Sequence, residues 1–258
     1  MAIYKGNKKV VAVYKGSTPI SKIYKGGTLV FQKSGGGGNT HLIEGTATGN
    51  FNLKINNQKI PITPDADGKW FYDTDEKITN LNNAFYNQTK VTSVDLSNLD
   101  LTGISIKSMF QGSSNITSIK FNNTKSMKLL SPNSTFYGCS SLVSLDLKSF
   151  DISDVVSVNS LFRGCSSLVS LDLSNWNTSN LKGASYLFDG CSSLVSLDLS
   201  NFDMSKATSY NNMFQNCTSL STIKCKQAFK DWCITNQGTI KLPTAMQEGG
   251  SGTWEIVA

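Results

Sequence analysis

The phrase CSSLVSLDL occurs three times without change, at residues 139–147, 165–173 and 191–199. Each copy is preceded by Phe-x-Gly, and the phenylalanine recurs at a spacing of 26 residues, or 25 for the first interval. These phenylalanines are Phe85, Phe110, Phe136, Phe162, Phe188 and Phe214, and the cysteines of the later copies are Cys139, Cys165, Cys191 and Cys217. The sequence therefore predicts six copies of one structural unit.

A period of this length that contains LxxLxL is typical of leucine-rich repeats, in which each copy adds a short strand to a parallel sheet. In the third complete copy we expect Leu194, Leu197 and Leu199 to point inward and Ser196 and Asp198 to face outward. Each unit is too small to fold alone, so stacking of the units must supply a continuous core.

The second half of each unit predicts a short helical segment on the opposite face. Ala207, Tyr210, Met213 and Phe214 follow one another at the three- and four-residue spacing of a helix. The glycine or asparagine two positions after each phenylalanine is typical of a left-handed helix end. The expected fold class is therefore an α/β repeat solenoid: a leucine-rich coil stack with a parallel sheet, preceded by a small β-rich cap and a short β-type arm.

Composition shifts divide the chain into five segments. A GGGG linker separates a basic arm from the body, and alternating apolar residues after the linker predict hairpins that cap the first repeat. The segments are a basic N-terminal anchoring arm (1–34), the glycine linker (35–38), a β-hairpin N-cap (39–80), the leucine-rich repeats (81–225) and a C-terminal cap (226–258).

The arm holds the whole positive excess of the chain. It carries seven of the 24 basic residues and no acid, so the remaining 17 basic residues stand against 18 acidic ones. Its three YKG phrases predict short strands separated by turns, and a segment this small must gain order from a partner or from copies of itself. The candidate anchoring residues are Tyr4, Lys5, Tyr14, Lys15, Tyr24 and Lys25. Lysines without arginine on strand-like spacing favour a protein partner over the rival, nucleic acid.

Composition also argues against several kinds of site. The chain has one histidine, His41, so a histidine-based triad or a multi-histidine metal site is not expected. No CxxC pair is present, which favours buried thiols over zinc, while a bridge between Cys225 and Cys233 stays open. The stretch Asp65-Ala66-Asp67-Gly68 lacks the later ligands of a calcium loop and predicts a tight turn. We expect no metal, no cofactor and no catalytic residue.

The outward positions of the strands form the candidate ligand-binding face. Hydroxyl and carboxylate columns suit a polar ligand, such as a surface glycan or a protein, that is held by hydrogen bonds. An enzyme is the rival interpretation, because carboxylates on adjacent coils would stand about 5 Å apart, near the separation of retaining glycosidases. A column that the fold repeats singles out no catalytic pair, however. The candidate residues are Ser144, Asp146, Ser170, Asp172, Ser196 and Asp198.

The unit FxGCSSLVSLDLSNFDxS, over residues 81–225, resembles the BspA-type leucine-rich repeat of bacterial surface proteins, found in Bacteroides relatives and mycoplasmas. That resemblance implies adhesion rather than catalysis. The three YKG phrases resemble N-terminal segments of virion proteins, head or tail fibres, from crAss-like phages of Bacteroides-like hosts. This second resemblance implies a fibre or decoration protein that is anchored by its arm and forms a homo-oligomer, with a trimer as the first expectation.

Two functions therefore compete. The first is a phage virion structural protein that displays the repeats for host-surface binding, and the second is a bacterial cell-surface adhesin. MAIYKGNKKVVAVYKG lacks the apolar stretch of a secretory signal, and no apolar run approaches the ~20 residues that span a bilayer. These observations favour a virion protein that is assembled in the host cytoplasm and does not insert into a membrane.

Overall fold

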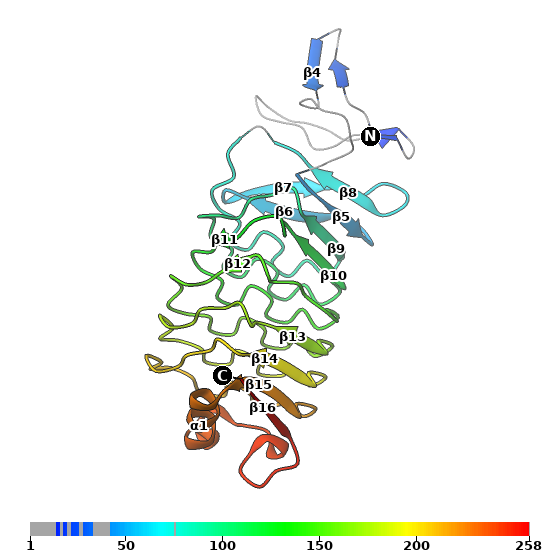
Figure 1. Ribbon diagram of the computed structural model, residues 1–258. Coiled ribbons are helices and arrows are strands. Elements are labelled where there is room, and N and C mark those ends of the chain that lie inside the picture. The colour runs from blue at the N-terminus through cyan, green and yellow to red at the C-terminus, as the bar shows by residue number, and fades with distance from the viewer. Residues whose placement is uncertain are drawn as a thin grey trace.

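The computed structural model describes residues 14–15, 18–19, 22–25, 28–32, 42–74 and 76–257. Within the arm, strands β1 (Tyr14–Lys15) and β2 (Thr18–Pro19) form one antiparallel pair. Strands β3 (Lys22–Lys25) and β4 (Thr28–Gln32) form a second antiparallel pair. From residue 42 onward the chain winds into a stack of coils with a cap at each end (Figure 1).

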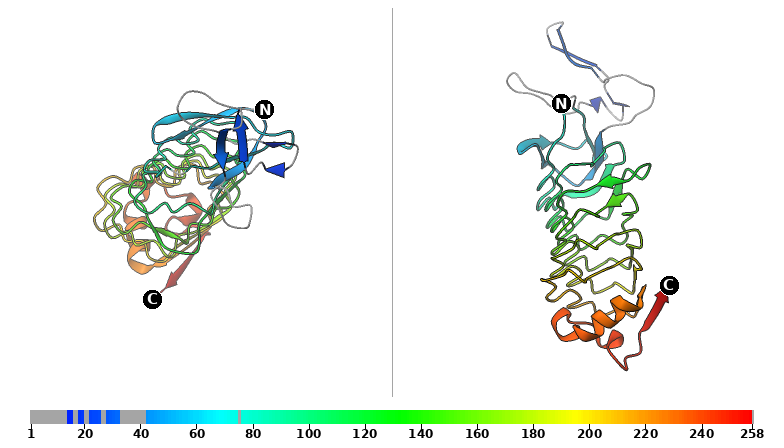
Figure 2. Two further views of the ribbon diagram at one scale, coloured as in Figure 1. Left: turned by 90° about the horizontal axis from the view of Figure 1, so that it is seen from above. Right: turned by 60° about the vertical axis from the view of Figure 1, so that its left-hand side comes forward.

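The expected leucine-rich coil stack with parallel strands is confirmed (Figures 1 and 2). Every coil but the one that contains residues 143–148 contributes one short strand to the same side of the stack, which we call the strand face. Parallel pairs join β9 to β10 and join β13, β14, β15 and β16 in that order. These strands are β9 (Val91–Leu96), β10 (Ser118–Phe121), β13 (Ser170–Asp172), β14 (Ser196–Leu199), β15 (Thr222–Lys226) and β16 (Thr253–Val257).

The sheet is interrupted in the middle of the stack, where the sequence predicted a continuous one. Residues 143–148, all of them described, form no strand, although they repeat the phrase that forms β13 and β14. At this level a parallel pair at a neighbouring corner, β11 (Met127–Lys128) with β12 (Phe150–Asp151), joins adjacent coils instead. Ser144 and Asp146 therefore do not lie on a strand.

The expected helical segments on the opposite face are not formed. Ala207–Phe214 and the equivalent residues of the other coils are turns, and we call this side the turn face. Phe136 N–H donates to Leu161 C=O of the next coil (3.0 Å), whereas the N–H of the following residue, Tyr137, closes a local turn on Ser134 C=O (3.2 Å). Because these two kinds of bond alternate, the backbone is paired without a helix.

Each coil of the turn face bends at two residues with left-handed backbone. In one coil these are Ser134 (φ 56°) and Gly138 (φ 74°). A Cβ on Gly138 would lie 3.5 Å from the Cα of Gly112 in the coil before, an ordinary contact distance, so the positive φ rather than a lack of space favours glycine here. Two left-handed residues four positions apart are incompatible with a helix, which explains why the helical spacing misled the prediction.

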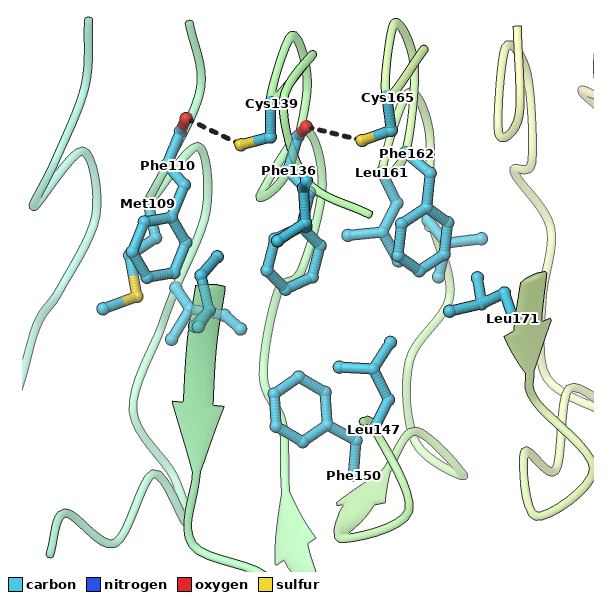
Figure 3. Close-up of a cluster of buried hydrophobic side chains, with 14 of the residues drawn as sticks. Met109, Phe110, Phe136, Cys139, Leu147, Phe150, Leu161, Phe162, Cys165 and Leu171 are labelled. Atoms are coloured by element: carbon cyan, nitrogen blue, oxygen red, sulfur yellow. Dashed lines mark hydrogen bonds between the residues drawn. The ribbon is translucent and has the colours of Figure 1, made fainter. Parts of the chain in front are cut away.

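A stack of phenylalanine rings runs through the core. Phe136 stacks on Phe110 and on Phe162 with ring centroids 5.9 and 5.7 Å apart. Beside the rings, the Cys139 thiol donates to Phe110 C=O (3.3 Å) and the Cys165 thiol to Phe136 C=O (3.1 Å) (Figure 3). The buried cysteine column thus links each coil to the previous one.

Ser113 occupies the cysteine position one coil earlier. Its hydroxyl donates to Phe85 C=O, as each thiol does to the phenylalanine carbonyl of the coil before its own. This shared hydrogen bond explains why serine replaces cysteine in the column: both side chains are small and both supply a donor.

The N-terminal cap continues both faces of the stack. Strand β5 (Ile43–Ala47) pairs antiparallel with β9 and with β8 (Lys69–Tyr72), which extends the strand face. Strand β6 (Phe51–Ile55) pairs with β7 (Gln58–Ile62) through the turn Asn56–Asn57, and Lys54 N–H donates to Ala84 C=O (2.9 Å) on the turn face. The expected β-rich cap is therefore confirmed.

The predicted tight turn between β7 and β8 is also present. Asp65 Oδ1 accepts the N–H groups of Asp67 and Lys69, both at 2.9 Å, and Gly68 has φ 76°. The side chain of Asp65 therefore organises its own turn.

The C-terminal cap combines helices with the last strand. Helices α1 (Gln227–Thr235) and α2 (Gln237–Ile240) and the 3-10 turn η1 (Thr244–Met246) follow β15. Cys225 and Cys233 lie buried here as free thiols. No helix in the described part of the chain is long and apolar enough to cross a bilayer.

Candidate ligand-binding face

The structure brings four of the six predicted ligand residues together in register. Ser170 pairs with Ser196, and Asp172 with Asp198, on the adjacent strands β13 and β14. Neighbouring strands lie about 4.8 Å apart, so the four side chains form a compact polar patch. Ser170 and Asp172 are exposed, and Ser196 and Asp198 are half-buried.

Ser144 and Asp146 are also exposed, one coil earlier, but outside any strand. The Nδ2 group of Asn123 donates to Asp146 Oδ2 at 2.9 Å. This third copy of the patch is therefore present at the surface, with a different backbone beneath it.

Each of the three aspartates has a structural role that the sequence reading missed. Oδ1 of Asp146, Asp172 and Asp198 accepts the backbone N–H two residues further on, at 3.1, 3.0 and 3.1 Å. This contact is an Asx turn, which bends the chain at the end of the strand segment. The available signal was the spacing Asp-x-Ser. The serine supplies the N–H in two of the three copies, and Lys148 supplies it in the other.

The charges at the two ends of the strand face are paired. Lys224 Nζ lies 3.0 Å from Asp198 Oδ2, and Lys120 Nζ lies 3.5 Å from Asp95 Oδ2. Burial favours a higher pKa for Asp198, but hydrogen bonds from Ser200 and Lys224 outweigh burial and hold the pKa below its usual value. Asp198 is therefore a carboxylate at neutral pH and can accept hydrogen bonds from a ligand.

A row of exposed valines borders the serine column and was not predicted. Val143, Val169 and Val195 are 51, 45 and 43% exposed, although valine is usually buried. Their backbones are linked from coil to coil, with Val169 N–H to Val143 C=O at 3.2 Å and Val195 N–H to Val169 C=O at 2.9 Å. These valines occupy the second position of LxxLxL. Side chains at this position point outward, and this direction was the signal from which their exposure could have been predicted. The patch thus offers apolar as well as polar contacts.

The predicted anchoring residues are only partly described. Tyr14 and Lys15 form β1, and Tyr24 and Lys25 lie in β3. Tyr4 and Lys5 lie outside the described residues. Short strands are therefore present in the described part of the arm, and the expected turns between them lie outside the described residues.

Two open hollows lie near the ends of the stack. One, of about 560 Å³, lies between the N-terminal cap and the first coils and is lined by Leu42, Ile78 and Asp100 among others. The other, of about 550 Å³, is lined by Lys230, Trp254 and neighbours in the C-terminal cap. Across the described ranges, no group of three or more His, Cys, Asp or Glu side chains could hold a metal ion.

Comparison with protein families yields two matches within the coil stack. Residues 73–155 match the family described as BspA type leucine rich repeat region (6 copies). Residues 130–240 match the family described as Mycoplasma protein of unknown function, DUF285. A search of the curated proteins found no match.

Among solved structures, the chain is similar to a leucine-rich repeat protein of T. pallidum. Sequence identity is 18%, the TM-score is 0.39, and the match covers 59% of this chain and 68% of that chain. The strand register and the repeat period, together with the match of residues 73–155 to the BspA-type repeat family, identify the body of this chain as a leucine-rich repeat coil stack.

Proposed function

We propose that this protein is a non-enzymatic adhesion module that binds a polar surface ligand through the strand face. The observation that carries the proposal is the in-register patch of Ser170, Ser196, Asp172 and Asp198 beside the valine row, in which Ser170 and Asp172 are exposed and Ser196 and Asp198 are half-buried. Hydroxyls can donate and accept hydrogen bonds, carboxylates accept them, and valine methyl groups contact apolar ring faces. A surface glycan presents all three kinds of complementary group.

Catalysis is a poorer interpretation of the same aspartates. Each of their carboxylates already accepts a turn N–H, and the same arrangement recurs on successive coils. A repeated structural acceptor explains the aspartate column without a reaction, and no single carboxylate pair differs from the rest.

We further propose that the arm, residues 1–34, anchors the protein on a phage particle and that the coil stack is displayed outward. The arm carries seven lysines and no acid, and its described part forms short strands that can pair with a partner's strand edge. Copies of the arm can pair in the same way, so the protein would assemble as a homo-oligomer, with a trimer as the first expectation.

Changing Asp146, Asp172 and Asp198 together to asparagine should weaken binding to host cells by about tenfold or more, because charge-assisted hydrogen bonds are lost. Asparagine keeps the turn acceptor, as Asn177 Oδ1 does for Ser179 N–H at 3.1 Å. Binding of labelled protein to cells, measured alongside the thermal melt, gives the result.

The matched control changes Asp151 and Asp203 to asparagine. Both accept a turn N–H two residues on, at 2.9 and 2.8 Å, but they lie at the next corner of the coil rather than on the strand face. This control should bind as the wild type does. Unchanged binding of the triple variant, with an unchanged melt, would remove the strand face as the ligand site.

Deletion of residues 1–34 should abolish incorporation into phage particles while the coil stack keeps its melting transition, since no stack residue is removed. Immunogold labelling of particles and of bacterial cells with an antibody to the repeats measures the outcome. Particles that carry the truncated protein as densely as the full chain contradict the anchoring role, and label on the bacterial surface alone favours the adhesin.

A further inference from the structure

Three consecutive blocks of this chain are identical at every position but one. Residues 136–147, 162–173 and 188–199 all read FxGCSSLVSLDL, and x is Tyr137, Arg163 and Asp189 in turn. Arg163 is the only arginine in the chain. Any information that tells these three blocks apart must come from this position or from the residues between blocks.

The contacts made by the identical positions do not distinguish one block from another. Phe162 stacks on Phe136 at 5.7 Å and on Phe188 at 5.8 Å. The thiols of Cys165 and Cys191 each lie 3.1 Å from the phenylalanine carbonyl of the previous coil. A block stacked on the wrong neighbour would therefore keep the same ring, thiol and leucine contacts.

The variable position, by contrast, makes contacts that only one order of blocks allows. Arg163 Nε lies 2.9 Å from Asp189 Oδ2. The Arg163 guanidinium also lies over the rings of Tyr137 in the coil before (5.5 Å) and Tyr186 in the coil after (4.6 Å). Arg163 thus contacts a specific residue on each side.

Asp189 depends on this neighbour because it is buried. Its residue is 5% exposed, and its second oxygen, Oδ1, accepts a hydrogen bond from Asn216 Nδ2 at 3.2 Å. If the block 188–199 stacked directly on 136–147, Asp189 would face Tyr137 in place of Arg163. A buried carboxylate without its cation is strongly disfavoured.

We propose that Tyr137, Arg163 and Asp189 form a register key that sets the order in which the three identical blocks stack. Looping out one 26-residue coil costs only modest closure entropy, so misordered stacking is an accessible trap during folding. The complete stack buries one more coil and is favoured at equilibrium. The key therefore acts on the folding route, by making misordered intermediates short-lived.

The test is refolding of the double variant Arg163→Gln, Asp189→Gln. Glutamine occupies the same position in the outer coils, as Gln111 and Gln215, so it fits the column. Chains unfolded for about a second, before prolyl isomerisation, are returned to native conditions and followed by tryptophan fluorescence. The variant should gain a slow phase with about tenfold more amplitude than in the wild type, because misordered states are no longer disfavoured.

The matched control is Asp100→Gln, Lys125→Gln, which removes an exposed ion pair whose side chains are 43 and 53% exposed. It should refold as the wild type does. The exchanged variant Arg163→Asp, Asp189→Arg restores a unique pair in reverse order and should remove most of the slow phase. If the glutamine variant does not fold, the refolding of the exchanged variant tests the proposal in its place.

Three results would overturn the proposal. They are wild-type refolding phases in the glutamine variant, an equal slow phase in the exposed-pair control, and a slow phase in the exchanged variant as large as in the glutamine variant. The first means that the blocks find their order without the key, the second that any lost ion pair has this effect, and the third that opposite charges at the position are not what matters.

Discussion

Replacement of Leu171 by aspartate is expected to abolish the cooperative unfolding transition of the coil stack. Leu171 lies in β13 with 3% of its surface exposed, paired in register with Leu197 of β14. An unpaired charge at such a site costs on the order of 5 kcal/mol, a large part of the stability of an ordinary domain. Since each coil packs only on its neighbours, a disrupted coil also exposes the coils on both sides.

Val169→Asp is the matched control, because Val169 lies two residues earlier in the same coil and is 45% exposed. It introduces the same charge and should keep the transition in a urea or thermal melt followed by circular dichroism. A Leu171→Asp protein that stays soluble and melts as cooperatively as the control would show that the leucine columns do not form the core.

Alkaline pH should destabilise the coil stack, because the buried thiols must lose their protons as the pH rises. Burial raises the pKa of Cys139 from 9.0 to about 12 and that of Cys191 likewise to about 12, and it raises the pKa of Cys165 and Cys217 as well. The folded chain therefore holds these protons more tightly than the unfolded chain. Their contribution to stability is complete below pH 9 and is lost as the pH rises toward 12.

The expected size follows from the number of thiols. Each thiol that is protonated in the folded chain and ionised in the unfolded chain lowers the free energy of unfolding by about 1.4 kcal/mol per pH unit. The four thiols of the cysteine column give a slope of roughly 5 kcal/mol per pH unit above pH 9. Cys225 and Cys233 add to it, because burial raises their pKa as well. Urea titrations at several pH values between 8 and 11 measure this slope.

The double variant Cys165→Ser, Cys191→Ser removes two of the six buried thiols, so the slope should fall by about half of what the four-residue column contributes. Serine does not ionise in this range, and Ser113 shows that a hydroxyl fits the column and donates to the carbonyl of the preceding coil. Lysine and tyrosine ionisation is the same in both proteins, so the difference reports the thiols. Equal slopes in the two proteins contradict the assignment.

The inward residues of the stack were predictable from the sequence because their cause is local and repeated. Leu194, Leu197 and Leu199 recur with one period, and the coil stack buries the copies of all three in the blocks 136–147, 162–173 and 188–199 except Leu145, which is half-buried where the sheet is interrupted. The β-rich cap was also predictable, since alternation and the turn residues Asn56–Asn57 are short-range signals, and both asparagines have positive φ (48° and 66°).

The turn face was not predictable by the same rules. Helical spacing of apolar residues in Ala207–Phe214 indicates only that one side is buried, and alternating turn and inter-coil hydrogen bonds bury the same side. The available signal was a pair of positions four apart that hold Ser, Asn or Gly, as in Ser134 and Gly138, in every coil but the one where Tyr186 takes the first position. The break in the sheet at residues 143–148 has no counterpart in the sequence, because the phrase there is unchanged.

The candidate site was predictable in position but not in chemistry. Register alone places Ser170 beside Ser196 and Asp172 beside Asp198. The Asx turns depend on how the backbone bends after the strand. The exposure of Val169 depends on the direction in which its side chain points just before β13 begins. Neither follows from the period of the repeat.

The near-identity of the three blocks also bears on how such a chain can change over generations. A gene that encodes the same phrase at intervals of 26 codons is prone to unequal recombination, which inserts or removes whole coils. Because both caps contact only the coils next to them, such an event keeps the ends intact and changes their separation by about 4.8 Å per coil. The reach of the molecule is therefore adjustable in fixed steps, and each inserted coil must acquire its own partner for the variable position before its place in the order is defined.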